Sequence, residues 1–285
     1  MSDIGTPSST DQASYWNGEG GQIWVRNMDR TEANFVSLTP RLLACAAAQP
    51  GEQVLDIGCG GGETSRALAQ AVSPDGAVLA VDISEPILRV ARQRHGTVAN
   101  LDFLQADAGD RDFGTARFDL LFSRFGVMFF ADPVAAFGNL HRSLKPTGRL
   151  VFMCWRALDE NPWIAAPTQA AIAALGEAYR PAPPADPHAP GPFAFADADH
   201  VRDILRHAGF TAVAIDPLDE PLHLGDLHTA LDYLKNMGPI SQALPKVDAD
   251  QRHAVDLAMR NALDRYRVDG EVRAPSATWI VTARP

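Results

Sequence analysis

The stretch Val54-Leu55-Asp56-Ile57-Gly58-Cys59-Gly60-Gly61-Gly62-Glu63-Thr64 decides the fold of this chain. It begins as a short apolar run after the turn pair Pro50-Gly51, which predicts a buried strand. Glycines follow, and a helical pattern over residues 64–72 comes next. A strand, a glycine loop and a helix in succession present backbone N–H groups to a ligand at a helix N-terminus. We expect a side chain at Gly58 or Gly60 to occupy ligand space.

The spacing of these glycines separates two kinds of nucleotide cofactor. A dinucleotide site has Gly-x-Gly-x-x-Gly, and its third glycine allows a helix to pack closely on a strand. Counted from Gly58, that third position holds Glu63, which is large and charged. Asp56 completes the pattern Asp-x-Gly-x-Gly, which resembles the signature loop of class I S-adenosylmethionine-dependent methyltransferases. The alternative is a tight turn without a ligand, because short glycine motifs also occur by chance.

Further strands that alternate with helices predict an α/β fold with a doubly wound sheet. We expect strands at 53–57, 77–81, 101–104, 118–122, 149–154, 211–215 and 278–283, and helices at 39–48, 63–72, 84–95, 132–144, 162–179, 197–209, 226–236 and 248–267. Polar residues follow three of the strands: Asp82, Asp107 and Ser123. In an open parallel sheet such strand ends border one crevice.

The resemblance gives these strand ends roles in cofactor binding. It implies that Asp82 accepts hydrogen bonds from both ribose hydroxyls, as one carboxylate can, although the spacing also suits the ribose acid of a dehydrogenase. It implies that Asp107 receives the adenine amino group. Trp16 or Trp24 could line the crevice, as N-terminal helices often do in this family. The alternative is that these two tryptophans fasten the N-terminus to the core. The implied cofactor-binding set is Asp56, Gly58, Cys59, Gly60, Asp82, Ile83, Asp107, Ala108, Ser123 and Trp24.

The pattern as a whole predicts a mostly parallel, seven-stranded, Rossmann-like sheet with helical cap insertions. We expect a disordered N-terminus at 1–12, a cofactor-binding core at 13–155, a cap insertion with a proline-rich loop at 156–196, a core helix and strand at 197–216, a helical cap insertion at 217–272 and a closing strand at 273–285. In the resembled family such insertions cover the acceptor pocket, and the last strand runs antiparallel to its neighbours.

Composition limits the classes of partner. The 285 residues carry a net charge of −10, which argues against nucleic acid and anionic membrane, because phosphate binding needs clustered Lys and Arg. Cys45, Cys59 and Cys154 are dispersed and match neither a metal motif nor a disulfide framework, which favours a reduced cytoplasmic protein. Residues 1–12 lack the apolar segment of a signal peptide, and no apolar run is long enough to span a membrane. We expect no metal and leave the oligomeric state open.

A further motif narrows the resemblance within the methyltransferase superfamily. Leu144-Lys145-Pro146-Thr147-Gly148 is similar to the family's Leu-x-Pro-Gly-Gly, and the chain resembles the small-molecule branch that includes ubiquinone/menaquinone-biosynthesis-type enzymes. The turn Ser123-Arg124-Phe125-Gly126 differs from the Asn/Asp-Pro-Pro-Tyr type of enzymes that methylate base amines. The resemblance implies S-adenosyl-L-methionine as cofactor, S-adenosyl-L-homocysteine as product and a small, partly apolar acceptor. Two alternatives remain: an NAD(P)-dependent oxidoreductase and a non-catalytic S-adenosylmethionine-binding protein.

Methyl transfer requires few catalytic side chains. The enzyme holds the nucleophile in line with the methyl group in a dry pocket, and a base is needed only for a protonated nucleophile. The weak candidates are His223 and His228, in the second insertion, and Arg124, which could pair with a carboxylate of acceptor or cofactor or form an internal salt bridge.

Aromatic residues near the end of the fifth strand predict an acceptor pocket. Trp155-Arg156 leaves that strand at the same carboxyl edge as Asp82 and Asp107. Trp163 follows, and Phe129 lies in the turn after the fourth strand. Such pockets are mostly apolar with a few polar groups, so we expect these four residues to bind the acceptor. The alternative is that Trp155 and Trp163 only pack the insertion onto the sheet.

Overall fold

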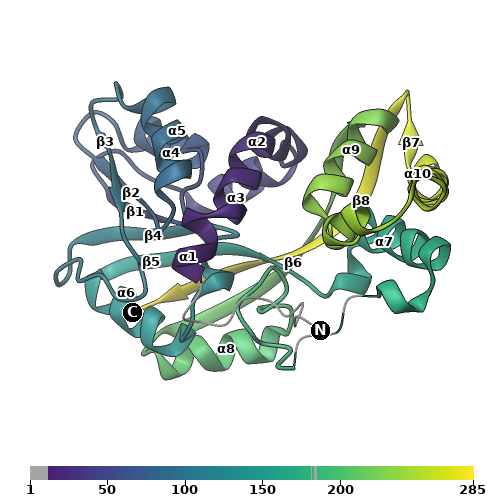
Figure 1. Ribbon diagram of the computed structural model, residues 1–285. Helices are drawn as coiled ribbons and strands as arrows, with labels where there is room; N and C mark the ends of the chain where they lie inside the picture. The colour runs from purple at the N-terminus through teal and green to yellow at the C-terminus, as the bar shows by residue number, and fades with distance from the viewer. Residues whose placement is uncertain (1–11, 181, 183–184) are drawn as a thin grey trace.

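The computed structural model describes residues 12–180, 182 and 185–285, and a single eight-stranded sheet organises them (Figure 1). The strands are β1 (Gln53–Ile57), β2 (Ala77–Asp82), β3 (Leu101–Gln105), β4 (Phe118–Arg124), β5 (Leu144–Trp155), β6 (Thr211–Asp226), β7 (Arg267–Val268) and β8 (Glu271–Arg284). Their order is β3-β2-β1-β4-β5-β8-β6, and β7 pairs with β8. The first five strands are parallel, whereas β8 runs antiparallel to both β5 and β6. The predicted α/β fold is confirmed, with β7 as an eighth strand that the sequence pattern did not predict.

Helices cover both faces of the sheet and extend beyond it. They are α1 (Gln12–Asn17), α2 (Glu19–Asn34), α3 (Leu38–Ala46), α4 (Glu63–Val72), α5 (Glu85–His95), α6 (Pro133–Ser143), α7 (Pro162–Leu175), α8 (Ala198–His207), α9 (Leu227–Met237) and α10 (Ala249–Asp264). Figure 1 shows α3, α4 and α5 on one side of the sheet and α6 and α8 on the other. Between these layers the side chains of Phe118, Phe122, Phe137 and Phe152 are fully buried. Among the described residues, no helix is both long and apolar enough to cross a bilayer.

Helix starts follow capping chemistry that the sequence displays. The Oγ of Ser84 accepts a hydrogen bond from the backbone N–H of Ile87, and Asp132 Oδ1 accepts one from Ala135 N at 3.0 Å. A proline in the first turn follows each cap, where its missing N–H costs nothing. These local signals explain why the predicted starts of α5 and α6 lie within one residue of the observed ones.

The cap differs from the expected helical insertion. Strand β6 continues to Asp226 instead of ending at 215, and β8 begins at Glu271 instead of 278. The two strands form a long antiparallel ribbon that carries α9, α10 and β7 away from the core, next to α7 (Figure 1). Burial alternates along its outer part, for example at Leu222 and Leu224 of β6. We call the assembly of α7, α9, α10, β7 and the outer ribbon the cap.

The N-terminal helices lie against the core and reach the cap. Residues 1–11, which belong to the segment predicted to be disordered, lie outside the described residues, but Gln12 is buried and begins α1. Asn17 fastens α1 to the end of β2: its Nδ2 donates to Ile83 O at 3.0 Å and its Oδ1 accepts from Glu85 N at 3.0 Å. On the cap side, Arg30 of α2 forms an ion pair with Asp232 of α9. Helix α2 therefore bridges the two parts of the molecule.

Candidate functional site

The glycine loop between β1 and α4 has two glycines with different tasks. Gly58 has φ +67°, and a Cβ built there would lie 2.8 Å from the Cα of Gly126. Gly58 thus permits two loops to touch, and a side chain there would meet Gly126 before it reached the ligand space that the sequence analysis expected it to occupy. Gly60 also has positive φ, +56°, but a Cβ there would meet only the Trp24 Nε1 atom, at 3.9 Å. Gly60 is the glycine whose missing side chain leaves open space.

A small pocket opens over this loop, and we call it the cradle. Its lining residues are Trp24, Glu32, Phe35, Gly58, Cys59, Gly60, Thr64, Arg124 and Phe125. The cradle brings together four of the predicted cofactor residues, which are Trp24, Gly58, Cys59 and Gly60. Arg124, predicted as a weak catalytic candidate, also lines it.

Asp56 lies behind the cradle and does not line it. Its side chain is fully buried, and its Oδ2 accepts hydrogen bonds from Thr64 Oγ1 at 2.9 Å and Ser65 Oγ at 2.6 Å. Its Oδ1 has no hydrogen-bond partner among the described residues. Burial raises the pKa of this carboxyl to about 6, although the two hydroxyls oppose the rise. Asp56 therefore orients the first turn of α4. At a pH above its pKa it also places a negative charge beneath the loop.

Asp82 connects the glycine loop to the end of β2. Its Oδ2 accepts from Gly60 N at 3.0 Å, and its Oδ1 accepts from Ser84 N at 2.9 Å. Burial nevertheless raises its pKa above the usual value for an aspartate. Each carboxylate oxygen has a second lone pair, so Asp82 keeps acceptor capacity beside Gly60. This geometry is compatible with the predicted ribose role.

The other predicted cofactor residues lie around the same sheet edge but outside the cradle lining. Asp107 is exposed, and its Oδ1 accepts from Gly109 N at 2.8 Å. Ala108 is buried in the core, and the carbonyl of Ile83 accepts from Asn17. Ser123 is fully buried, donates to Ile57 O at 2.7 Å and accepts from Gly126 N at 3.2 Å. Ser123 thus fixes the contact between the two loops from inside.

One wall of the cradle is an ion pair whose acidic partner the sequence did not identify. Arg124 pairs with Glu32 of α2, and its Nη1 donates to Thr39 Oγ1 at 2.6 Å. The Arg124 side chain is 8% exposed, and its guanidinium lies 5.3 Å from the ring centroid of Phe35. Of the readings proposed for Arg124, the internal salt bridge is the one observed here. Glu32 is far from the glycine motif in sequence. The one sequence signal that could have placed it at the cradle is its position eight residues after Trp24, on the same face of a helix.

The predicted acceptor residues form a second layer behind the cradle. Trp155 stacks on Phe125 with ring centroids 4.3 Å apart, and Trp163 packs on Trp155 at 5.3 Å. Both indoles are buried, and Trp163 Nε1 donates to Asn161 Oδ1. These contacts agree with the alternative that Trp155 and Trp163 pack the insertion onto the sheet. Of the three stacked rings, only Phe125 lines the cradle.

Two further predicted residues have other surroundings. Phe129 packs edge-on against Trp16 of α1 at 5.2 Å, beneath the N-terminal helices. Arg156 pairs with Glu160 and with Asp219, the latter at 2.8 Å, and lies over a tryptophan of β8. Its charge is therefore engaged at the base of the ribbon.

The histidine candidates lie in the cap. His223 belongs to β6, where it pairs with Arg273 of β8, and His228 is exposed in the first turn of α9. Neither residue lines the cradle. The structure does not bring either base candidate to the glycine loop.

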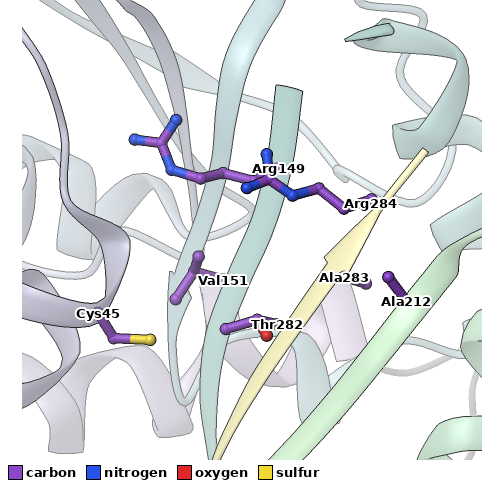
Figure 2. Close-up of a pocket in the computed structure, with 7 residues that line it drawn as sticks. All are labelled: Cys45, Arg149, Val151, Ala212, Thr282, Ala283 and Arg284. Atoms are coloured by element: carbon purple, nitrogen blue, oxygen red, sulfur yellow. The ribbon is translucent and has the colours of Figure 1, made fainter. Parts of the chain in front are cut away.

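A second hollow lies at the opposite edge of the sheet, beside β5, β8 and β6 (Figure 2). Its lining residues are Cys45, Arg149, Val151, Ala212, Thr282, Ala283 and Arg284. Arg149 is committed to Glu52 at 2.7 Å, and Arg284 Nη1 donates to the carbonyl of Gly148 at 3.1 Å. This edge holds the amino ends of the parallel strands, whereas ligands of open α/β sheets bind at the carboxyl ends. We therefore take the cradle as the functional site.

Across residues 12–180, 182 and 185–285, no group of three or more His, Cys, Asp or Glu side chains could hold a metal ion.

Comparison with known proteins finds similarity over the part of the chain that contains the glycine loop. Residues 55–152 match the family described as "Methyltransferase domain". The demethylmenaquinone methyltransferase of Staphylococcus carnosus is 33% identical over 111 residues, which are 39% of this chain and 46% of that protein. The ubiquinone/menaquinone biosynthesis C-methyltransferase UbiE of Ectopseudomonas mendocina is 36% identical over 111 residues, 38% of this chain and 43% of that protein. The chain therefore spans less than half the length of these relatives.

Solved structures share the fold over more of the chain. A phosphoethanolamine N-methyltransferase 2 of Haemonchus contortus, in complex with S-adenosyl-L-methionine, has a TM-score of 0.59 and 16% identity, covering 96% of this chain and 60% of that one. The [4+2]-cyclase SpnF has a TM-score of 0.58 and 17% identity, covering 99% of this chain and 98% of that one. At these identities the likeness shows the fold alone, and the two neighbours have different chemistry in their descriptions.

Proposed function

We propose that this chain, which carries a class I S-adenosylmethionine-dependent methyltransferase domain, transfers a methyl group to a small, partly apolar acceptor by in-line displacement. One observation carries the proposal: Gly60, open on its ligand side, donates its N–H to the carboxylate of Asp82 at 3.0 Å. This joins the glycine loop and the acid at the end of β2 at one point of the sheet edge. The match of residues 55–152 to methyltransferase domains supports the same reading.

The residues of the site fit S-adenosyl-L-methionine, which supplies an electrophilic methyl group on a sulfonium when it is bound. Gly60 would receive the methionine portion, Asp82 the ribose hydroxyls and the exposed Asp107 the adenine amino group. Trp24 covers the loop from α2. Carboxylates beside and beneath the loop, Asp82 and Asp56, favour a cationic ligand over a neutral one.

The acceptor would meet apolar walls. Phe35 and Phe125 line the cradle, and Trp155 stacks behind Phe125. Apolar walls with few polar groups are typical of small-molecule pockets, and they exclude water from the line of displacement. The chain's residues thus position an apolar acceptor and keep the site dry. We assign no general base, because His223 and His228 do not line the cradle.

A second candidate is a protein of this fold that binds the cofactor without methyl transfer. The [4+2]-cyclase among the structural neighbours shows that the fold does not dictate methylation. An oxidoreductase is disfavoured because Glu63 occupies the third glycine position of a dinucleotide loop and bonds to His95 instead.

One experiment separates these functions. The purified chain is incubated with methyl-labelled S-adenosyl-L-methionine and a panel of hydroquinones, phenols, amines and carboxylates, and S-adenosyl-L-homocysteine is quantified. We expect labelled product with at least one acceptor. Binding of S-adenosyl-L-methionine without turnover on the panel would favour the non-catalytic candidate, and a thermal shift with NAD(H) alone would favour the oxidoreductase.

The proposal also includes the compartment and the partners. Cys45, Cys59 and Cys154 are free thiols, which supports a reducing cytoplasm. The net charge of −10 supports a small-molecule acceptor over a nucleic acid. Fractionation of cells that produce the tagged chain tests the location.

A further inference from the structure

The wall of the cradle that belongs to α2 is held in a fixed position. Trp24, Met28 and Glu32 are spaced by four residues and lie on one helical face. Met28 packs so closely on the loop that a Cβ on Gly61 would lie 2.5 Å from its Sδ. Trp24 stands over Gly60 one turn earlier. Glu32 is therefore presented to the cradle by a helix that lies along the glycine loop.

The ion pair between Glu32 and Arg124 is partly removed from water. The side chains are 20% and 8% exposed, and both line the cradle. Desolvation offsets much of the attraction in such a pair, so a buried ion pair is weak evidence for a role in stability. Both partners also keep spare capacity. Within the described part of the chain, Arg124 bonds only to Thr39 and Glu32 with its five N–H groups, and Glu32 accepts only from Arg124.

The charges identify the ligand group that this wall fits. A simple anion would be attracted by Arg124 but repelled by Glu32. A simple cation would be attracted by Glu32 but repelled by Arg124. A group with a carboxylate and an ammonium on one carbon satisfies both side chains at once. Such a group is the α-amino-acid end of S-adenosyl-L-methionine and S-adenosyl-L-homocysteine. The adjacent Gly60 leaves room for it.

We propose that Glu32 and Arg124 together recognise the zwitterionic α-amino-acid end of the cofactor, with Arg124 bound to its carboxylate and Glu32 to its ammonium. This inference rests on the proposed function and adds a determinant of cofactor specificity. Charge-assisted hydrogen bonds of this kind are stronger than neutral ones, and the guanidinium suits a carboxylate because its N–H groups form a planar fork.

The test is calorimetric titration with two ligands and two variants. S-adenosyl-L-homocysteine has the amino-acid end, and 5′-methylthioadenosine keeps the adenosine but lacks that end. In Glu32→Gln we expect roughly tenfold or greater loss of affinity for S-adenosyl-L-homocysteine, as for a lost charged hydrogen bond. Affinity for 5′-methylthioadenosine should stay within about twofold. Asp29→Asn is the matched control, because Asp29 is also on α2 and paired with an arginine, Arg94, but does not line the cradle.

A measurement on the unmodified protein makes the test independent of variant folding. Wild type should bind S-adenosyl-L-homocysteine at least about tenfold more tightly than its decarboxylated analogue. Equal affinity for these two, or a Glu32→Gln variant that binds S-adenosyl-L-homocysteine like wild type, would overturn the inference alone. Equal losses for both ligands in Glu32→Gln would also overturn it and show a structural role. Wild type that binds neither ligand would remove the proposed function as well.

Discussion

The carboxyl edge of β1 to β4 and the ribbon of β6 and β8 are built on different principles. Strands β1 and β4 are short and almost wholly buried, and each is followed by a loop that lies at the cradle. The ribbon strands have 16 and 14 residues, and in their outer parts buried positions alternate with more exposed ones. The structure of the cofactor end is therefore determined by local sequence, whereas the cap depends on pairing between distant segments.

We expect the largest effect from a substitution in the glycine loop, at the cofactor end of the molecule. Gly60→Val should abolish detectable binding of S-adenosyl-L-homocysteine, because the new side chain enters the open space over the loop. Gly114→Val is the control, since Gly114 also has positive φ, +84°, and nothing lies within 4 Å of its Cβ position. It imposes similar backbone strain but should leave affinity unchanged. Calorimetric titration checks both variants after circular dichroism has shown that they fold, and retained affinity in Gly60→Val would contradict the cradle.

A change at the boundary between core and cap tests the packing layer. Trp163→Ala should lower the free energy of unfolding by about 3–5 kcal/mol, because a buried indole is lost from its contact with Trp155. Urea denaturation measures this. Cofactor affinity at low temperature should be unaffected. If stability is unchanged while the Michaelis constant for the acceptor rises, Trp163 lines the pocket as the sequence alone predicted.

The buried acid beneath the loop predicts a pH dependence. Its pKa is about 6 in the folded chain and near 4 when unfolded, so the folded state holds the proton longer as pH rises. Ionisation of Asp56 therefore costs stability, and the cost grows from pH 4 to above pH 6. Relative to wild type, Asp56→Asn should gain about 2 kcal/mol of unfolding free energy between pH 4 and pH 7. Parallel stability curves for the two proteins would show that Asp56 is not the group responsible.

A smaller effect is expected at the end of β2. Asp82→Ala should weaken S-adenosyl-L-homocysteine binding at least about tenfold, because it removes the acceptor proposed for the ribose hydroxyls. Asp82→Asn, which keeps one acceptor oxygen, should be milder. The melting temperature of each variant monitors loss of the bonds to Gly60 and Ser84. Wild-type affinity in Asp82→Ala would place the ribose elsewhere.

The same contrast explains what the sequence could predict. The bounds of β1 and α4 match the expectation at 53–57 and 63–72, since an apolar run, glycines and an amphipathic helix are local signals. The length of the ribbon was not predictable from the sequence, because Pro217, Pro221 and Pro275 are residues that ordinarily interrupt strands. The two strands form over this length because they pair with each other. Only the alternation around Leu222 and Leu224 pointed to a strand.

The cradle shows the same limit residue by residue. Gly60 and Asp82 were predictable because each is next to a recognisable strand. Glu32 was not, because its contact with Arg124 joins segments that are far apart in sequence, and a lone acid on a helix ordinarily faces solvent. The second task of Gly58 was not predictable either, because its contact with Gly126 exists only in the folded chain.

The central claim is that the cradle over Gly60 is the cofactor site, and a crystal structure of the chain with S-adenosyl-L-homocysteine tests it most directly. We expect ligand density over Gly60, with the ribose hydroxyls within hydrogen-bonding distance of the Asp82 carboxylate and the α-amino-acid end against Glu32 and Arg124. Density in the hollow of Figure 2, at the opposite edge of the sheet, or at any place that leaves Gly60 and Asp82 without contact to the ligand, would contradict it.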